Sequence, residues 1–235
     1  MKKKIDAPVS KKTGLSSAGL KYLAAAAMTT AHIGLLFAHG ELYFLLRCIG
    51  RLAFPLYAFL IAQGAVYTHS RTRYAVRLFL CGILSEPVFD RVFYGSWWQP
   101  AHQNVLCTLL LGLLSLYAAD ALIGALKCGS FSCHAAVHIG MAMIFGGAAQ
   151  ALGTDYGWYG VALVVLFYLL RAYPAAECMA LAALSLVRGG MQSMAITAVV
   201  PILLYNGEKG HSGRWFYFYY PGHLAVLGLL AGLLL

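Results

Sequence analysis

The sequence predicts an all-α, polytopic integral membrane protein with about nine transmembrane helices. Apolar residues make up 61% of the 235 residues and charged residues only 11%, about half the charged fraction of a soluble domain or less. The apolar residues form continuous runs of about 20, the length that an α-helix needs to cross a bilayer. A helix also satisfies its own backbone hydrogen bonds in lipid. This composition excludes a soluble globule, a disordered tail and a disulfide-rich scaffold.

Glycine, proline and clusters of charge divide the apolar sequence into successive elements. Residues 1–17 form a polar, basic tail, and residues 18–235 are expected to form a single transmembrane domain. The expected spans lie near 18–38, 43–67, 74–94, 103–126, 134–152, 157–173, 175–188, 190–205 and 215–235. The seventh of these is short, and a re-entrant segment stays open there.

The positions of the basic residues predict the orientation. A net charge of +9 first suggests nucleic acid or anionic lipid as a partner, but the charges gather in the tail and in alternate loops. With the tail inside, the inner set is Lys2, Lys3, Lys4, Lys11, Lys12, Lys21, Arg71, Arg73, Arg77, Lys127, Arg171, Lys209 and Arg214, and the outer set is Arg47, Arg51, Arg91 and Arg188. This bias follows the positive-inside rule. We therefore expect a cytoplasmic N-terminus, the lipid bilayer as a partner and no nucleic acid.

The cysteines carry a weaker signal. Most are expected to act as small apolar residues within the spans. Cys128 and Cys133 fall in an inner loop, where a reducing compartment is expected. Together with His134 and His138 they offer ligand types that suit zinc. The spacing is loose, however, so no metal site is assigned.

Polar residues that lipid should exclude come together near the outer ends of several spans. A charged side chain costs about 2.5 to 3.5 kcal/mol on insertion scales, so such residues tend to face a partner or a wet cavity. The outer set is His32, Arg47, Arg51, Glu86, Asp90, His102, Gln103, Asn104, Asp155 and Tyr156. If they converge, Arg47, Arg51, Asp90, Asn104, Asp155 and Tyr156 are candidate substrate-binding residues.

Within this set, His32 is the candidate general base. Imidazole at the depth of His32 is expected to be neutral and able to take a proton from an amine or hydroxyl. The alternative is a structural role, in which His32 only forms a hydrogen bond with a carbonyl group of a neighbouring helix. Arg47 and Arg51 project from one helical face, and Glu86 and Asp90 are their expected partners. That pairing is compatible with a structural ion network or with a site in which Glu86 assists catalysis.

The inner basic residues suggest a phosphate site. Arg71, Arg73 and Arg77 crowd one inner loop and the following span, where they either anchor the topology or clamp phosphates with their planar guanidinium groups. Lys209 and Arg214 lie on another inner loop, in a glycine-rich segment that begins at Asn206. His223 follows Pro221 in the last span, and it is the second candidate base.

These residues occur in motifs that resemble the TraX family from about residue 19 to the C-terminus. The motifs are Arg47-Cys-Ile-Gly-Arg-Leu-Ala-Phe-Pro55, Tyr74, Arg77-Leu78, Ser85-Glu86, Gln103-Asn104-Val105, Asp155-Tyr156-Gly157, Tyr205-Asn-Gly-Glu-Lys-Gly210 and Tyr219-Tyr-Pro-Gly-His223. The resemblance implies an N-acetyltransferase of the bacterial inner membrane that moves an acetyl group from acetyl-CoA to an amine such as a pilin N-terminus. A CoA site would suit the inner basic loops, so the candidate cofactor-binding residues are Arg71, Arg73, Arg77, Asn206, Lys209 and Arg214.

Two positions depart from the family pattern. Ala31 stands where the family commonly has an aspartate before the histidine, so another carboxylate, with Glu86 the nearest guess, would have to orient His32. Lys209 replaces the usual arginine of the glycine-rich turn, which keeps the charge but not the bidentate geometry. The alternative function is a transporter or a non-catalytic membrane assembly subunit with a buried charge network.

Overall fold

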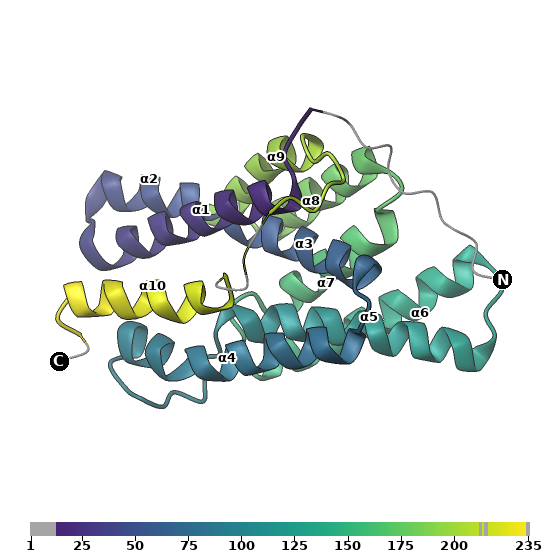
Figure 1. Cartoon of the computed structure of the whole chain (residues 1–235), viewed down its shortest axis with the longest axis horizontal. Coiled ribbons are helices and arrows are strands. Elements are labelled where there is room, and N and C mark those ends of the chain that lie inside the picture. Colours follow the sequence, from purple (N-terminus) through teal and green to yellow (C-terminus); the bar gives the residue numbers. More distant parts are fainter. Residues whose placement is uncertain (1–12, 212, 214–215, 234–235) are drawn as a thin grey trace.

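The protein is an all-helical bundle in the computed structural model, which describes residues 13–211, 213 and 216–233. The helices are α1 (Ser17–Phe37), α2 (Gly40–Gly50), α3 (Ala53–Tyr67), α4 (Arg71–Tyr94), α5 (Val105–Leu126), α6 (Phe131–Ala151), α7 (Gly157–Leu170), α8 (Pro174–Arg188), the 3₁₀ helix η1 (Gly190–Ala198), α9 (Val199–Leu203) and α10 (Phe216–Leu230). Figure 1 shows α1 and α2 side by side at one end of the long axis, with α10 between α1 and α4.

The predicted elements agree closely with these helices, with two differences. The second expected span is broken into α2 and α3 by a turn at Arg51 and Leu52. The eighth begins as the 3₁₀ helix η1 and becomes α-helical only in α9. Four stretches within the described part of the chain are long and apolar enough to cross a bilayer: Ser17–Phe37, Gly40–Tyr67, Val105–Leu126 and Phe131–Ala151. Crossing by the remaining helices stays a prediction.

The centre of the bundle is made by α3, α5 and α7. Leu113 and Leu116 of α5 and Phe167 of α7 have no exposed surface, and the edge of Phe167 packs against the ring of Phe59 in α3. Without a hydrophobic force between helices in lipid, such close packing is a principal source of helix association. This centre fixes the starting points of α3, α5 and α7, where the polar residues described below lie.

Two pairs of loops are joined by backbone hydrogen bonds. Leu15, just before α1, bonds Leu204 and Asn206 after α9, so the segment before α1 is held against the segment after α9. At the other set of helix ends, Gln103 bonds both Gly153 and Asp155. The loop that carries Asp155 is therefore fixed against the loop before α5.

The turn between α5 and α6 differs from the sequence expectation. Cys128 and Cys133 form a disulfide, although they were expected as thiols in a reducing compartment. The bonded sulfurs leave no thiolate for a metal, and the described residues contain no group of three or more histidine, cysteine or acidic side chains arranged to hold one. The zinc hypothesis for this motif therefore has no support.

Candidate functional site

A polar cavity of about 490 Å³ lies where α1, α2, α3, α4, α10 and the α6–α7 loop meet. This volume falls within the range of small-molecule sites. Five of the residues that the sequence singled out line it together: His32, Arg47, Arg51, Asp155 and Tyr156. They come from three separate parts of the chain, so their convergence is a property of the fold.

Hydrogen bonds fix the neutral tautomers of His32, which lines the cavity, and of His223 beside it. The Nδ1 atom of His223 lies 2.9 Å from the backbone oxygen of Tyr219 and must donate, because a carbonyl only accepts. In the neutral ring the Nε2 atom of His223 then accepts, and it lies 2.9 Å from Nδ1 of His32. His32 therefore donates through Nδ1, which leaves its Nε2 atom with a free lone pair.

This chain of bonds answers the question raised by Ala31. An aspartate is not the group that orients His32 here, since His223 accepts the Nδ1 proton instead. Glu86, the carboxylate guessed for that role, does not line the cavity. His223 lines a neighbouring groove between α1 and α10 rather than the cavity itself, so the two candidate bases have different surroundings.

Arg47 and Arg51 reach the cavity from the end of α2. The Nη1 atom of Arg51 donates to Oε1 of Gln192 at 3.1 Å, whereas the Nε atom of Arg47 is shielded from solvent and has no hydrogen-bond partner. Neither arginine forms an ion pair with a carboxylate within the described residues. The predicted pairing with Glu86 and Asp90 is therefore wrong.

Asp155 and Tyr156 are positioned by the α6–α7 loop. Gly153 has φ +64°, and a Cβ there would lie 2.0 Å from the backbone oxygen of Ala101, so only glycine allows this loop to close. Burial raises the pKa of Asp155, while the nearby Arg51 and Arg47 act in the opposite direction. Burial also raises the pKa of Tyr156, which keeps its hydroxyl protonated and able to donate.

Three residues that hold Arg51 were missed by the sequence reasoning. Gln192 donates to the hydroxyl of Tyr159 at 3.3 Å, and that hydroxyl lies 3.1 Å from Oγ of Ser185. All three are buried. A buried polar residue in an apolar stretch is a signal that marks Gln192, but the 3₁₀ backbone that directs it toward Arg51 has no clear signature in the sequence.

Three predicted substrate-binding or catalytic residues lie behind the cavity wall. Asn104 caps α5 and donates to Glu86 through both its backbone and its side chain. The buried carboxylate of Asp90 accepts from the backbone N–H of Gln99 at 2.7 Å. These contacts fix the α4–α5 connection, so Glu86, Asp90 and Asn104 support the site from outside the cavity.

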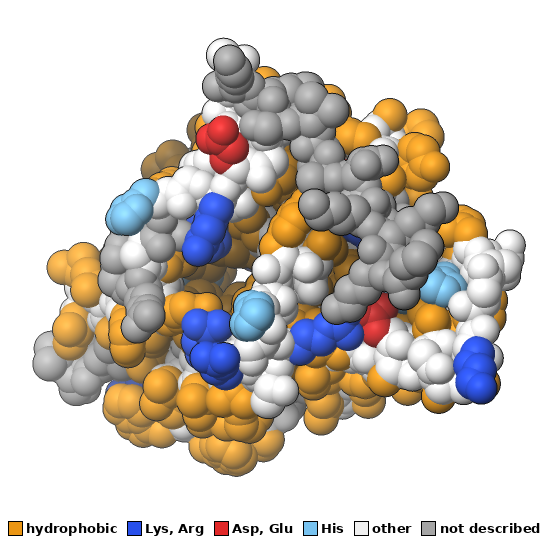
Figure 2. Space-filling view, turned by 45° about the vertical axis from the view of Figure 1, so that its right-hand side comes forward, with side chains coloured by type: hydrophobic (Ala, Val, Ile, Leu, Met, Phe, Trp, Pro, Cys, Tyr) orange, Lys and Arg blue, Asp and Glu red, His pale blue; other side chains and the backbone are white. Residues whose placement is uncertain are grey.

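The inner basic residues do not form one cluster. Arg73 and Arg77 share a face of α4, where Nε of Arg77 donates to the backbone oxygen of Arg73 at 3.0 Å and its guanidinium lies 5.9 Å from the ring centre of Tyr217. Figure 2 shows lysine and arginine side chains separated from one another on this side of the molecule, with hydrophobic side chains beneath them. The side chain of Arg71 instead contacts Asp120 of α5.

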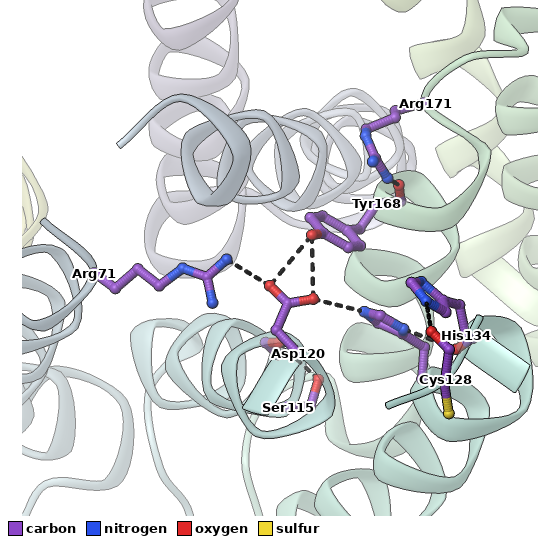
Figure 3. Close-up of polar contacts among 9 residues, drawn as sticks. Arg71, Ser115, Asp120, Cys128, His134, Tyr168 and Arg171 are labelled. Atoms are coloured by element: carbon purple, nitrogen blue, oxygen red, sulfur yellow. Dashed lines mark hydrogen bonds and ion pairs between the residues drawn. The ribbon is translucent and has the colours of Figure 1, made fainter. Parts of the chain in front are cut away.

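Arg71 belongs to a second polar cluster between α4, α5, α6 and α7 (Figure 3). Its Nη2 atom donates to Asp120 at 2.5 Å. The same carboxylate lies 3.5 Å from Nε2 of His138 and accepts from the hydroxyl of Tyr168 at 3.4 Å. The sequence analysis did not single out Asp120, which lies within the expected span 103–126.

The remaining predicted phosphate ligands lie in the loop after α9. Asn206 is buried and its side chain accepts from the backbone N–H of Glu208, so its amide stabilises the turn. Lys209 is exposed, and its backbone oxygen accepts from Ala18. Arg214 lies outside the described residues.

Apolar helices long enough to span a bilayer, packed around a polar cavity, define an integral membrane protein with an internal site. The chain belongs to the TraX protein family, whose model matches residues 16–231. It is 30% identical over 251 aligned positions to the probable fimbrial assembly protein FimC, serogroup H1, of Dichelobacter nodosus, which covers 93% of this chain and 97% of the relative. No solved structure matches the chain.

Proposed function

We propose that the protein is an acetyl-CoA-dependent N-acetyltransferase of the bacterial inner membrane that acts on an amine such as a pilin N-terminus. The observation that carries this proposal is the histidine pair beside a cavity in which, among the described residues, two arginines form no ion pair with a carboxylate. Family membership and the name of the fimbrial relative support it. Acetyl-CoA would supply the acetyl group as a thioester, whose thiol leaves readily.

His32 is the proposed general base. Its Nε2 lone pair accepts a proton from the acceptor nitrogen as that nitrogen forms its new bond to the acetyl carbonyl carbon. His223 keeps the Nδ1 proton of His32 directed away from the cavity, so the basic nitrogen is presented to the acceptor. General base catalysis of this kind contributes about 10² to 10⁴ in rate.

Arg51 and Tyr156 are proposed to stabilise the charge that develops on the carbonyl oxygen. Gln192 holds Arg51 in place before the substrate binds, which reduces the reorganisation needed during the reaction. Tyr156 lines the same cavity, and its protonated hydroxyl is a hydrogen-bond donor. Asp155 and Arg47 remain for the acceptor.

The residues at the opposite end of α4 fit an anionic donor. Arg73 and Arg77 are exposed on one face there, and Lys209 lies in the α9–α10 connection, beside the start of α1. Arg214 belongs to the same connection but lies outside the described residues. Between Arg77 and the cavity residue Phe89, α4 rises about 18 Å at 1.5 Å per residue. An extended arm is therefore needed between a phosphate at this end and an acetyl group at the cavity, as pantetheine provides.

The proposal can be tested with protein purified in detergent, radiolabelled acetyl-CoA and a peptide with a free N-terminus. Wild-type protein should transfer label to the peptide nitrogen, and His32→Gln should reduce the rate by at least about 100-fold without changing the thermal unfolding midpoint by more than about 3 °C. His69→Gln is the control, because His69 is exposed before α4 and does not line the cavity. Equal transfer by His32→Gln and wild type would eliminate His32 as the base.

A non-catalytic assembly subunit or transporter is the second candidate. The name of the relative describes fimbrial assembly and no chemical reaction, and the buried Arg51–Gln192–Tyr159 network would also suit a structural role. The response of the protein to acetyl-CoA distinguishes an enzyme from an assembly subunit or transporter. An assembly subunit should show no thermal stabilisation by acetyl-CoA and no transfer to any amine.

A further inference from the structure

The charge of the cavity lining favours an acceptor that carries a negatively charged group in addition to its amine. The charged side chains that line the cavity are Arg47, Arg51 and Asp155, and His32 is neutral when it serves as the proposed base. The lining therefore holds one positive charge in excess. An uncompensated charge in a partly desolvated site is costly, so a ligand that carries a negative group gains affinity there.

Arg47 is the residue that meets this negative group. Arg51 is already engaged by Gln192, whereas Arg47 has an Nε atom that is shielded from solvent and has no partner. A guanidinium group with free N–H donors matches a carboxylate in a bidentate arrangement. Asp155 lies in the same cavity and suits the acceptor's ammonium group before it is deprotonated.

We propose that the acceptor is a polypeptide whose amino-terminal segment carries an acidic side chain, and that Arg47 binds this carboxylate while the terminal amine faces His32. The inference rests on the proposed function and names the substrate class. After the ammonium group has lost its proton, an amine with one neighbouring carboxylate carries a single negative charge, which balances the excess positive charge of the lining. An uncharged amino-terminal segment leaves that charge unbalanced.

Binding can be measured without acetyl transfer. Two peptides that differ only by glutamate or glutamine within the first few residues are titrated into wild-type protein in detergent at low salt. The glutamate peptide should bind about fivefold to tenfold more tightly, the range for a partly screened, charge-assisted contact. The preference should decrease with added salt. Equal binding of the two peptides by wild type would overturn the proposal.

Variants of Arg47 test whether this residue causes the preference for the glutamate peptide. Arg47→Gln should remove it, and Arg47→Lys, which keeps the charge, should retain part of it. Arg91→Gln is the matched control, because Arg91 lies outside the cavity lining and donates to the backbone of Gly95. A preference that persists in Arg47→Gln contradicts the assignment. Arg47→Lys keeps the test valid if Arg47→Gln fails to fold. A folded Arg47→Lys protein that shows no preference for the glutamate peptide also contradicts the assignment.

The peptide-binding experiment and the acetyl-transfer experiment can fail independently of each other. Acetyl transfer to both peptides with equal affinity would retain the acetyltransferase and reject the acidic acceptor. Preferred binding of the glutamate peptide without transfer would retain the acceptor and reject the enzyme. Competition by phosphoethanolamine with no discrimination between peptides would favour a small phosphate-bearing amine and reject a polypeptide acceptor.

Discussion

At the scale of single residues, the two histidines differ in role although both were candidate bases. His32 lines the cavity with a free Nε2, and His223 has both ring nitrogens in hydrogen bonds. The sequence predicted that both histidines matter because ionisable groups in spans need partners. It could not predict that they bond each other, since they lie 191 residues apart. Long-range pairing depends on how the first and last helices pack.

His223→Leu should reduce acetyl transfer without removing the base. Loss of the acceptor for the Nδ1 proton of His32 allows the other tautomer, which places the proton on Nε2 and leaves no lone pair in the cavity. We expect a decrease in kcat of about tenfold or more with little change in KM. His223→Gln supplies an acceptor oxygen and should restore part of kcat. No difference between the two variants would show that His223 does not select the tautomer.

The ionisation of Asp155 should determine how acceptor binding changes on the acid side of neutral pH. Burial raises its pKa, so its negative charge is lost at a higher pH than for an exposed aspartate. Acceptor binding should therefore weaken as the pH falls through this raised pKa, and Asp155→Asn should bind more weakly at neutral pH with a flatter acid limb. Because Asp155 is exposed to solvent at the cavity, Asp155→Asn should change the unfolding midpoint at neutral pH only slightly. KM and the unfolding midpoint are measured across pH.

At the scale of elements, apolar runs and their breaks predicted where helices occur but not their internal geometry. The turn between α2 and α3 places Arg51 at the cavity, and η1 directs Gln192 toward it. Both segments are apolar and were expected to continue as regular helices. Their irregular backbone depends on packing against neighbours, which hydrophobic periodicity does not encode.

The α1–α2 contact depends on Gly50. A Cβ at this position would lie 2.2 Å from the Cβ of Ala31, so Gly50→Val should separate the two helices. Because His32 and Arg51 are the next residues along each helix, we expect lower acetyl transfer and a destabilisation of about 1 to 3 kcal/mol. Gly140→Ala in α6, where nothing lies within 4 Å, should be neutral or slightly stabilising. Thermal unfolding in detergent gives both values.

The Arg71–Asp120 pair connects α4 to α5. Its side chains are 50% and 22% exposed, so solvent screens the attraction and a contribution of about 1 kcal/mol or less is expected. Arg71→Gln and Asp120→Asn should each lower the unfolding midpoint, and the double variant should lose less than the sum. The exposed Arg73, changed to Gln, is the control. Strict additivity would mean that the pair contributes nothing to stability.

At the scale of the whole molecule, α4 carries Arg71, Arg73 and Arg77 at its start and lines the cavity with residues near its end, such as Phe89 and Tyr94. The charge bias predicts that the basic end is cytoplasmic. His69→Cys, before α4, should react with a membrane-impermeant maleimide only after lysis, whereas Trp98→Cys, after α4, should react in intact spheroplasts. Both native side chains are exposed. The reverse pattern would invert the proposed direction of donor and acceptor entry.

The bond between His32 and His223 joins the first long helix to the last one. During synthesis, α1 leaves the ribosome long before α10 does, and His32 has no His223 to accept its proton in that interval. The proposed base is therefore set in its working tautomer only when the final helix has inserted. Nascent and truncated chains that lack α10 should therefore transfer acetyl groups more slowly than the complete chain, so full activity begins only when translation is complete.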